Sequence, residues 1–461
     1  MNESLKNLFT VSDLRKRVLF TLGLLAVYRV GHVITIPGVS LTALEAFAEQ
    51  LARNSVFGLY DMFSGGNLSK VTIFALGIMP YISASIILQL LTVVWPYLEK
   101  LSKEGELGRR KITQYTRYGT ILLSIVQGAG IAIFLEKNSA PGGFNLVLNP
   151  GFGFRLMTVL TLTTGTCFIM WLGEQITERG IGNGMSLIIY SGIVVNMPRA
   201  VMQTFSQMST GQIGFIRVLI LMVLMAAVVA AIVFVERGHR RVTVQYAKRV
   251  VGRRMYGGSS THIPLKVNTG GVIPVIFASS ILAFPATIAQ AIPGGWSEVI
   301  NTQLGFGMPL YNLLYVAGII FFTYFYTAII FNPDDVAENM RKYGGFVPGI
   351  RPGKRTAEYI DTILTRITLA GAIYLSIIAL LPNFLISGFK VAPIPFIGDW
   401  LDSVLPKFIT EGMNVTFYFG GTSLLIVVGV AMDTVQQVES QLIMRHYDGF
   451  MKKTRIRGRR A

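Results

Sequence analysis

The chain has 461 residues, of which 52% are hydrophobic and only 14% are charged, and its formal net charge is +17 at pH 7. The apolar residues form runs of about 20, which is the length a helix needs to cross a bilayer core. This composition excludes an ordinary soluble domain. Because the runs do not alternate as strands do, it favours transmembrane helices over a β-barrel. The single cysteine, Cys167, excludes a disulfide framework and a thiolate metal cluster.

Ten apolar segments predict an all-α polytopic membrane protein. In chain order they are residues 18–36, 72–94, 118–136, 153–173, 184–197, 215–235, 271–292, 309–330, 367–386 and 416–436. The first is interpreted as a retained span, because it is too long for a signal peptide and lacks a small-residue cleavage site. The fifth is short for a span. The glycine-rich stretch Gly180–Gly184 is expected to be a tight turn between spans four and five.

The basic residues predict the orientation of these spans. Of the 41 Lys and Arg residues, 32 lie before span one or after an even-numbered span, and six lie in the segments on the opposite side. Basic loops stay in the cytoplasm, so both termini are expected there. The predicted organisation is a cytoplasmic N-terminal segment 1–17, a first half 18–200, a second half 201–436 with cytoplasmic loops 236–270 and 331–366, and a basic cytoplasmic tail 437–461.

A nine-residue motif occurs twice. Gly77–Ser85 and Gly271–Ser279 are identical at five of nine positions, and they lie in segments two and seven. An offset of five spans means that the two copies cross the membrane in opposite directions. This is typical of an inverted-topology repeat, in which the halves are related by a pseudo-twofold axis and interrupted helices mark the working site. The alternative is coincidence, because small residues and proline are common in membrane helices.

The repeated motif suggests a local structure. Pro80 and Pro274 each remove a backbone donor, so a kink is expected at both. The small residues at 83–85 and 278–280 provide faces on which helices can pack closely. Ile82 and Ile276 occupy the same position in the two copies, so their side chains would converge if the repeats face each other. Otherwise these isoleucines are ordinary core residues.

Titratable residues are sparse in the spans. Arg29 and His32 are the clearly ionisable residues at depth, and Asp433 lies near the inner end of span ten. An ion-coupled transporter would usually carry buried acids along its path. The four histidines are scattered and no Ser/His/Asp or paired-carboxylate set can be assembled. No catalytic residue, metal site or cofactor is therefore expected, and the chain is not expected to be an enzyme. A secondary transporter or lipid flippase is kept as the alternative function.

The stretch Asp61–Ser69 precedes span two and is interrupted by Gly65 and Gly66. It could be a loop that ends in a helix N-cap at Ser69. It is also apolar enough to insert into the protein, which would make it a movable stopper.

Several stretches together resemble the SecY family, the channel subunits of bacterial protein-conducting translocons. They are Met62–Thr92, Gly105–Gly119, Trp171–Gly184, Pro264–Ile288, Phe346–Gly353 and Tyr418–Val428. The resemblance runs from about residue 5 to the tail. It implies a clamshell of two five-helix halves around an hourglass pore, which conducts unfolded preproteins and releases membrane helices sideways into the lipid. The region between Pro393 and Glu411 is longer than is usual in the family.

The resemblance also implies roles for particular residues, carried over by motif position. The pore ring would be Ile78, Ile82, Ile189, Ile276 and Ile426. The plug, at about 61–70, would be Phe63, Ser64, Gly65, Gly66, Asn67 and Leu68. The lateral gate to lipid would be Ser83 and Ile86 facing Phe284 and Ile288.

The cytoplasmic loops predict a docking surface. Residues 236–270 carry eight basic residues against one acid, and the alternation at 242–246 indicates a protruding hairpin. Asn332 and Pro333 are typical of a helix N-cap and first helical position. Topology and attraction to anionic lipids account for part of the basic charge.

The resemblance implies that these loops also bind other partners. Arg253, Arg254 and Arg351 would dock the SecA motor ATPase and the ribosome, with ribosomal RNA touched only through the ribosome. The remaining expected partners are the small membrane subunits SecE and SecG and preproteins that carry signal sequences. The expected location is the bacterial cytoplasmic (inner) membrane.

Overall fold

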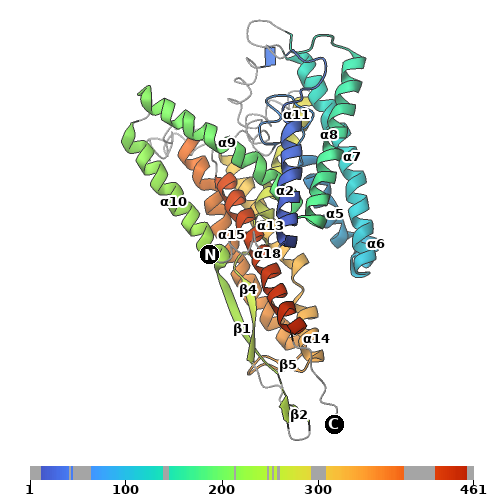
Figure 1. The fold of residues 1–461 in the computed structure, drawn as a ribbon, viewed down its shortest axis with the longest axis vertical. Helices are drawn as coiled ribbons and strands as arrows, with labels where there is room; N and C mark the ends of the chain where they lie inside the picture. Colours follow the sequence, from blue (N-terminus) through green and yellow to red (C-terminus); the bar gives the residue numbers. More distant parts are fainter. Residues whose placement is uncertain are drawn as a thin grey trace. The chain divides into compact units, whose positions relative to one another are not determined.

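The computed structural model describes residues 12–40, 43–44, 64–138, 145–211, 214–246, 249–251, 254–256, 260–291, 308–388 and 421–453. The chain forms two compact units, and Figure 1 shows that its described residues are mostly helical. Unit one comprises Met1–Arg199, Thr287–Ser297 and Val430–Ala461, and unit two comprises Ala200–Ala286 and Glu298–Gly429. Long helices make up most of both units. The protein is therefore an all-α polytopic membrane protein, apart from the small sheets described below.

The helices that begin in unit one are α2 (Ser12–Gly31), α5 (Met79–Val94), α6 (Pro96–Lys103), α7 (Glu106–Lys137), α8 (Phe152–Arg179) and α9 (Gly184–Ser209). α7 packs along α8 and also contacts α5. α5 and α6 meet at Trp95 with a bend of 99°. The bend has a local cause, because a residue that precedes proline is driven out of the helical region, and Trp95 is extended.

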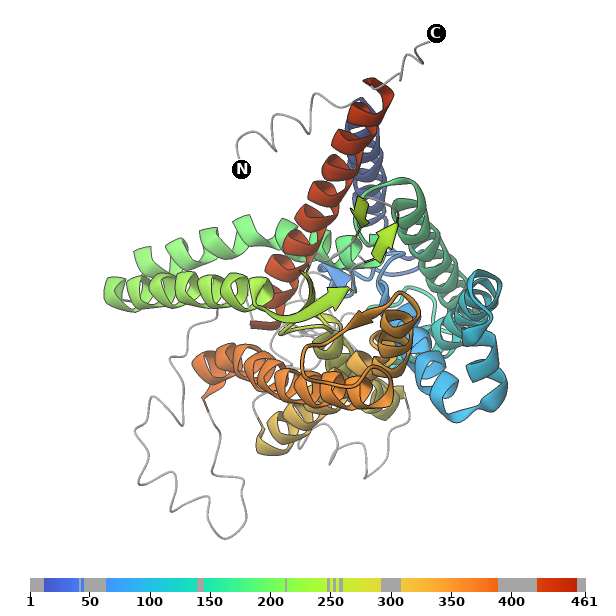
Figure 2. The same ribbon diagram turned by 90° about the horizontal axis from the view of Figure 1, so that it is seen from below.

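The helices that begin in unit two are α10 (Phe215–Arg237), α11 (Ile273–Ala291), α13 (Pro309–Ile330), α14 (Pro333–Lys342), α15 (Lys354–Ser387) and α18 (Gly421–Lys453). α13 lies against α15 (Figure 2). In the described part of the chain, six helices are long and apolar enough to cross a membrane, or seven if α5 and α6 form one span.

The hairpin expected in the loop 236–270 is confirmed. β1 (His239–Tyr246) pairs antiparallel with β4 (Ser260–Lys266) and, on its other edge, with β5 (Gly345–Phe346). Two short strands that lie between β1 and β4 in the sequence, β2 (Arg249–Val251) and β3 (Arg254–Tyr256), form a second antiparallel pair.

The three-stranded sheet has its own core. Buried Val242, Val244 and Leu265 pack with Met340, Val347 and Ile360 from α14, α15 and the loop before α15. The cap predicted for α14 is also confirmed, because the Asn332 side chain accepts a hydrogen bond from the Asp334 N–H and Pro333 lies in the first turn. The basic loops are therefore held on a packed scaffold.

Three local expectations are wrong. Pro80 and Pro274 do not kink their helices, because α5 begins at Met79 and α11 at Ile273, so each proline lies in the first turn, where no intrahelical N–H donor is required. The fifth span does not end at 197, since α9 continues through Pro198 to Ser209. Ser69 is not an N-cap, because no helix starts there and its hydroxyl donates to the Gly66 carbonyl.

The turn at Gly180–Gly184 is confirmed. Gly182 has φ of +89°, a conformation that glycine adopts without strain. The N–H of Ile181 donates to the Thr21 hydroxyl of α2, and the N–H of Gly182 donates to the Gln437 side chain of α18. The turn thereby ties α2, α8 and α18 together within unit one.

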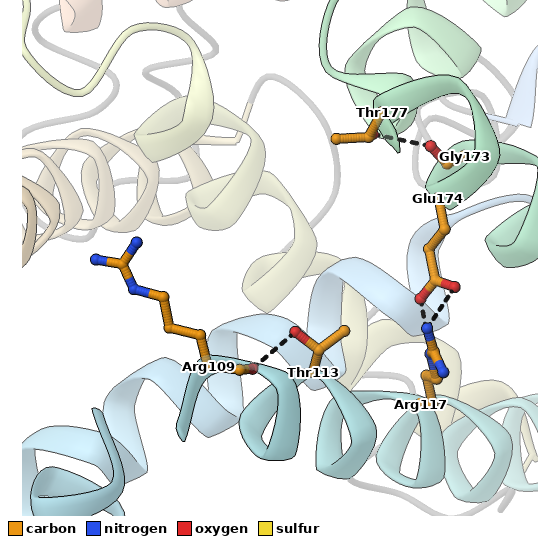
Figure 3. A network of polar contacts seen from close by, with 6 residues as sticks. All are labelled: Arg109, Thr113, Arg117, Gly173, Glu174 and Thr177. Carbon is orange, nitrogen blue, oxygen red and sulfur yellow. Dashed lines mark hydrogen bonds and ion pairs between the residues drawn. The ribbon is translucent and has the colours of Figure 1, made fainter. Parts of the chain in front are cut away.

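A bidentate ion pair joins α7 to α8 (Figure 3). Nε and Nη2 of Arg117 each donate to a carboxylate oxygen of Glu174 at 2.8 Å. This forked geometry fixes the orientation of the Arg117 and Glu174 side chains as well as the distance between them. The Arg109 side chain on α7 extends away from this pair, so Arg117 alone provides this contact with Glu174 among the six residues of Figure 3.

The core of the sheet can be tested with two adjacent residues of α15. The Ile360 side chain is 1% exposed, whereas the Tyr359 side chain is 38% exposed. Ile360→Ala leaves a cavity under the sheet and should cost about 2–5 kcal/mol of local stability. Trypsin should then cleave the basic hairpin faster in the detergent-solubilised protein. Trypsin should cleave the Tyr359→Ala variant at the wild-type rate. Equal cleavage rates for the wild type, Ile360→Ala and Tyr359→Ala would contradict the assigned core.

Candidate functional site

The two copies of the repeated motif have the same backbone conformation at the start of their helices. Gly77 has φ of +54° and Gly271 has φ of +59°. Each glycine is followed two residues later by the first residue of a helix. The Ile82 N–H donates to the Ile78 carbonyl in one copy, and the Ile276 N–H donates to the Val272 carbonyl in the other. Few side chains tolerate this φ, so the glycines explain why both copies turn into their helices in the same way.

The five isoleucines expected in the ring are all buried in the structure. They are Ile78 (2% exposed), Ile82 (7%), Ile189 (3%), Ile276 (6%) and Ile426 (0%). The first three belong to unit one and the last two to unit two. A packed core and a closed constriction both bury such residues, so the ring assignment stays a prediction.

The segment Ser64–Thr72, called here the seated segment, is held in a polar and glycine-lined site of unit one. Its Gly65 lies against Gly192 of α9, and a Cβ on Gly65 would be 2.7 Å from the Gly192 Cα. A Cβ on Gly192 would in turn be 3.0 Å from the Gly65 Cα. The two backbones can approach this closely only because both residues lack a side chain.

A buried carboxamide joins the seated segment to α2. Asn67 is fully buried, and its Nδ2 donates to the Tyr28 hydroxyl of α2 at 3.2 Å and to the Ser64 carbonyl. The Tyr28 hydroxyl donates to the Ser64 carbonyl at 3.2 Å. The Asn67 Oδ1 accepts from the Thr72 hydroxyl at 3.0 Å. It also contacts Nδ1 of His32, which lies directly after α2.

His32 lies between the carboxamide and a lysine. Its side chain is buried, and its Nε2 lies 3.2 Å from the Lys70 Nζ. A lysine ammonium group can only donate, so Nε2 is assigned as the acceptor. This leaves the proton on Nδ1, where it can be donated to the Asn67 Oδ1. The polar chain thus runs from Lys70 through His32 to Asn67.

The end of the seated segment is anchored by backbone contacts. The Ile36 N–H donates to the Val71 carbonyl, and the Ile73 N–H donates to the Ile34 carbonyl. Val71 has φ of +47° and is the one non-glycine residue with positive φ in the described part of the chain. This conformation is unfavourable for a β-branched residue.

The aromatic residue Phe74, two positions after this segment, fastens the region to the helices beside it. Its ring stacks on Tyr28 with centroids 5.7 Å apart and on Phe168 of α8 with centroids 6.1 Å apart. A Cβ on Gly31 would overlap the same ring. Phe74 therefore fills the space between α2 and α8.

Sequence reasoning found part of this site. It singled out Asp61–Ser69 as a loop or a movable stopper and His32 as an ionisable residue, but it missed Tyr28 and Gly192. His32 and Asn67 are 35 residues apart, and Gly65 and Gly192 are 127 apart, so no local pattern signals either contact. Phe63 lies outside the described residues.

The expected gate and docking residues are described in part. Ser83 is half-buried and Ile86 is 1% exposed, whereas the side chains of Phe284 and Ile288 lie outside the described set. Arg253 also lies outside the described residues, and Arg254 is described only as the first residue of β3.

Arg351 lies in an exposed turn before α15. It is exposed in a turn between Gly349 and Gly353, which have φ of +82° and +104°. Its carbonyl accepts from the buried Thr356 hydroxyl at 2.8 Å, which fixes the turn to α15. The guanidinium is thus presented on a rigid support.

The described residues contain no group of three His, Cys, Asp or Glu side chains placed to hold a metal ion. The polar groups around Asn67 are joined to one another by hydrogen bonds. What this arrangement can do is hold a short segment, irregular from Gly65 onward, in one position against α2 and α9.

Comparisons with known proteins agree on one family. Residues 72–435 match the SecY family model. The protein translocase subunit SecY of Escherichia coli K12 is 51% identical over 452 residues, which cover 97% of this chain and 96% of that protein. The protein of the same name from Aquifex aeolicus is 45% identical over 454 residues, with 98% of this chain and 100% of that protein covered.

Solved structures share the fold at low sequence identity. One, described as the structure of a protein conducting channel, has a TM-score of 0.63 at 15% identity and covers 93% of this chain and 92% of that chain. A second has a TM-score of 0.60 at 16% identity, with the same coverage, and its description says that the plug domain of the SecY protein stabilises the closed state. With matches that span nearly the whole chain in sequence and in fold, this chain belongs to the SecY family of protein translocase subunits.

Proposed function

We propose that this protein-conducting channel is closed at rest by the seated segment, which acts as a plug. The observation that carries the proposal is the way this segment is held. From Gly65 onward it is not helical, it contacts α9 through Gly65 and Gly192, and it contacts Tyr28 of α2 and His32, which follows α2. A related channel is described as having a plug that stabilises its closed state and maintains a membrane seal. We propose the same role for residues 64–72 of this chain.

The proposed conducting path is passive. The five buried isoleucines Ile78, Ile82, Ile189, Ile276 and Ile426 form an apolar ring, through which a flexible chain passes and hydrated ions do not. The shared backbone conformation of the two motif copies supports an inverted repeat around this ring. Ser83, Ile86, Phe284 and Ile288 form the proposed lateral gate, through which a signal sequence or a membrane helix leaves for the lipid. Unfolded preproteins are the proposed cargo.

Partners supply the energy and the cargo in this proposal. Related channels have been described in complex with ribosomes. For this chain we propose the ribosome and the SecA motor at the basic cytoplasmic loops, SecE and SecG as membrane subunits, and anionic lipids at the inner surface. We further propose that the protein lies in the bacterial cytoplasmic membrane with both termini inside. The exposed Arg351 and the packed sheet beneath the hairpin support this docking surface.

The plug seat can be tested by adding bulk to α9. Gly192→Val places a side chain against the Gly65 Cα, so the seated segment should be displaced and resting ion leak should rise. Single-channel recording of the purified complex in planar bilayers measures the leak. Gly23→Val on α2 is a matched control, because a Cβ there meets nothing within 4 Å. A Gly192→Val channel that seals like the wild type would rule out this seat.

The ring can be tested by polar substitution. An ion that enters an apolar constriction loses water contacts that isoleucine cannot replace, so Ile82→Asn combined with Ile276→Asn should raise ion leak. Recordings of ion current through reconstituted channels that keep the wild-type plug sequence measure this effect. An unchanged leak in the double variant would count against the ring.

The docking role of Arg351 can be separated from topology. Loss of a charge-assisted contact at an interface costs about 2–5 kcal/mol, so Arg351→Glu should abolish SecA-driven uptake into vesicles while membrane insertion stays normal. Arg355→Glu, at an exposed residue of the first turn of α15, makes the same change of charge and should leave uptake near the wild-type level. Equal uptake by both variants would contradict a docking role for Arg351.

A further inference from the structure

The site that holds the seated segment, called here the plug seat, has a polar interior. An apolar side chain in the same place would not carry the desolvation cost of a buried polar group. Burying a carboxamide is unfavourable unless each of its donors and acceptors has a partner. At Asn67 the partners are present, with Tyr28 and the Ser64 carbonyl at Nδ2 and with Thr72 and His32 at Oδ1. The carboxamide is therefore satisfied only while the seated segment stays against α2.

The partners of Asn67 come from two sides. Ser64 and Thr72 belong to the seated segment, so their bonds move with it. Tyr28 and His32 belong to α2 and the residue that follows it, so those two bonds break when the segment leaves. Lys70 of the seated segment closes a second link to α2 through the His32 Nε2.

We infer that Asn67, Tyr28 and His32 form a polar latch that sets the balance between the seated and released states of the plug. Asn67 is a positioning residue for this seal, and the inference rests on the proposed plug function. The hydrogen bonds of the latch run in one direction, because Lys70 donates to His32, His32 donates to Asn67, and Asn67 donates to Tyr28. The apolar contact of Gly65 with Gly192 fixes where the segment sits, whereas the latch determines how firmly it is held.

The latch uses both ring nitrogens of His32. The contact with Asn67 uses Nδ1, and the contact with Lys70 uses Nε2. An asparagine amide can take the place of Nδ1, and the longer glutamine amide can take the place of Nε2. His32→Asn should therefore keep the donor to Asn67, while His32→Gln keeps only the lysine side and His32→Leu keeps neither. A role in packing alone would not separate Asn from Gln in this order.

The experiment is ion-leak recording on the full translocase complex in planar bilayers at neutral pH. Asn67→Leu, Tyr28→Phe, His32→Leu and His32→Gln should each raise the ratio of open to closed time by about tenfold, which corresponds to about 1.4 kcal/mol. His32→Asn should stay near the wild-type ratio. Thr166→Val on α8 is the control, because it removes a buried hydroxyl whose bond stays within its own helix.

Coupling between the residues gives a second readout. If Asn67 and His32 act through one bond, the double variant Asn67→Leu/His32→Leu should leak little more than either single variant, because the second change removes nothing further. Tyr28→Phe keeps the ring that stacks on Phe74, so it reports on the hydroxyl even if the larger changes impair folding. Multiplicative effects in the double variant would overturn the latch.

The outcomes separate the latch from the plug. If Gly192→Val leaks and Tyr28→Phe and Asn67→Leu do not, the plug stands and the latch is overturned. If Gly192→Val also seals normally, the plug assignment fails and the latch fails with it. If His32→Asn leaks as much as His32→Leu, the directional bond from Nδ1 to Asn67 is wrong and the inference is overturned.

Discussion

Irregular backbone inside a membrane protein can persist only if its N–H and C=O groups find partners in the protein, and this constraint governs unit one. Each unpaired buried group costs several kcal/mol. Between Ser64 and the start of α5 the chain has no continuous helix, and its backbone groups find partners partly in local turns and partly in the residues around it. Residues 34 and 36 pair with the backbone at 71 and 73, and a single buried carboxamide serves the turn at Ser64. α2 is thus a structural support for the seated segment.

The same constraint explains why the two motif copies look alike. A helix that starts inside the protein needs an abrupt turn before it and few unsatisfied donors in its first turn. A glycine with positive φ provides the turn, and a proline one residue into the helix removes one of those donors. Both copies of the motif therefore provide the same way of starting a helix. This accounts for the identity of Gly and Pro in the two copies.

The sequence was a good guide where the governing interactions are local or periodic. It predicted most helices, the hairpin of β1 and β4, and the Asn332 cap, because hydrophobic runs, alternation and capping residues are read over a few positions. It failed at Pro80, where a proline in the first turn and a kinking proline have the same local signature. It did not predict the contact of Tyr28 with the seated segment, since tertiary pairing over 36 residues leaves no trace in one sequence.

The backbone at Val71 has a consequence for how firmly the seated segment is held. A β-branched residue held in the left-handed region stores about 1–3 kcal/mol of conformational strain, comparable to one or two hydrogen bonds. Under the proposed plug role, this strain opposes the bonds that hold the neighbouring residues in place and lowers the free energy needed to release the seated segment. An arriving chain would then have to supply the amount by which those bonds outweigh the strain.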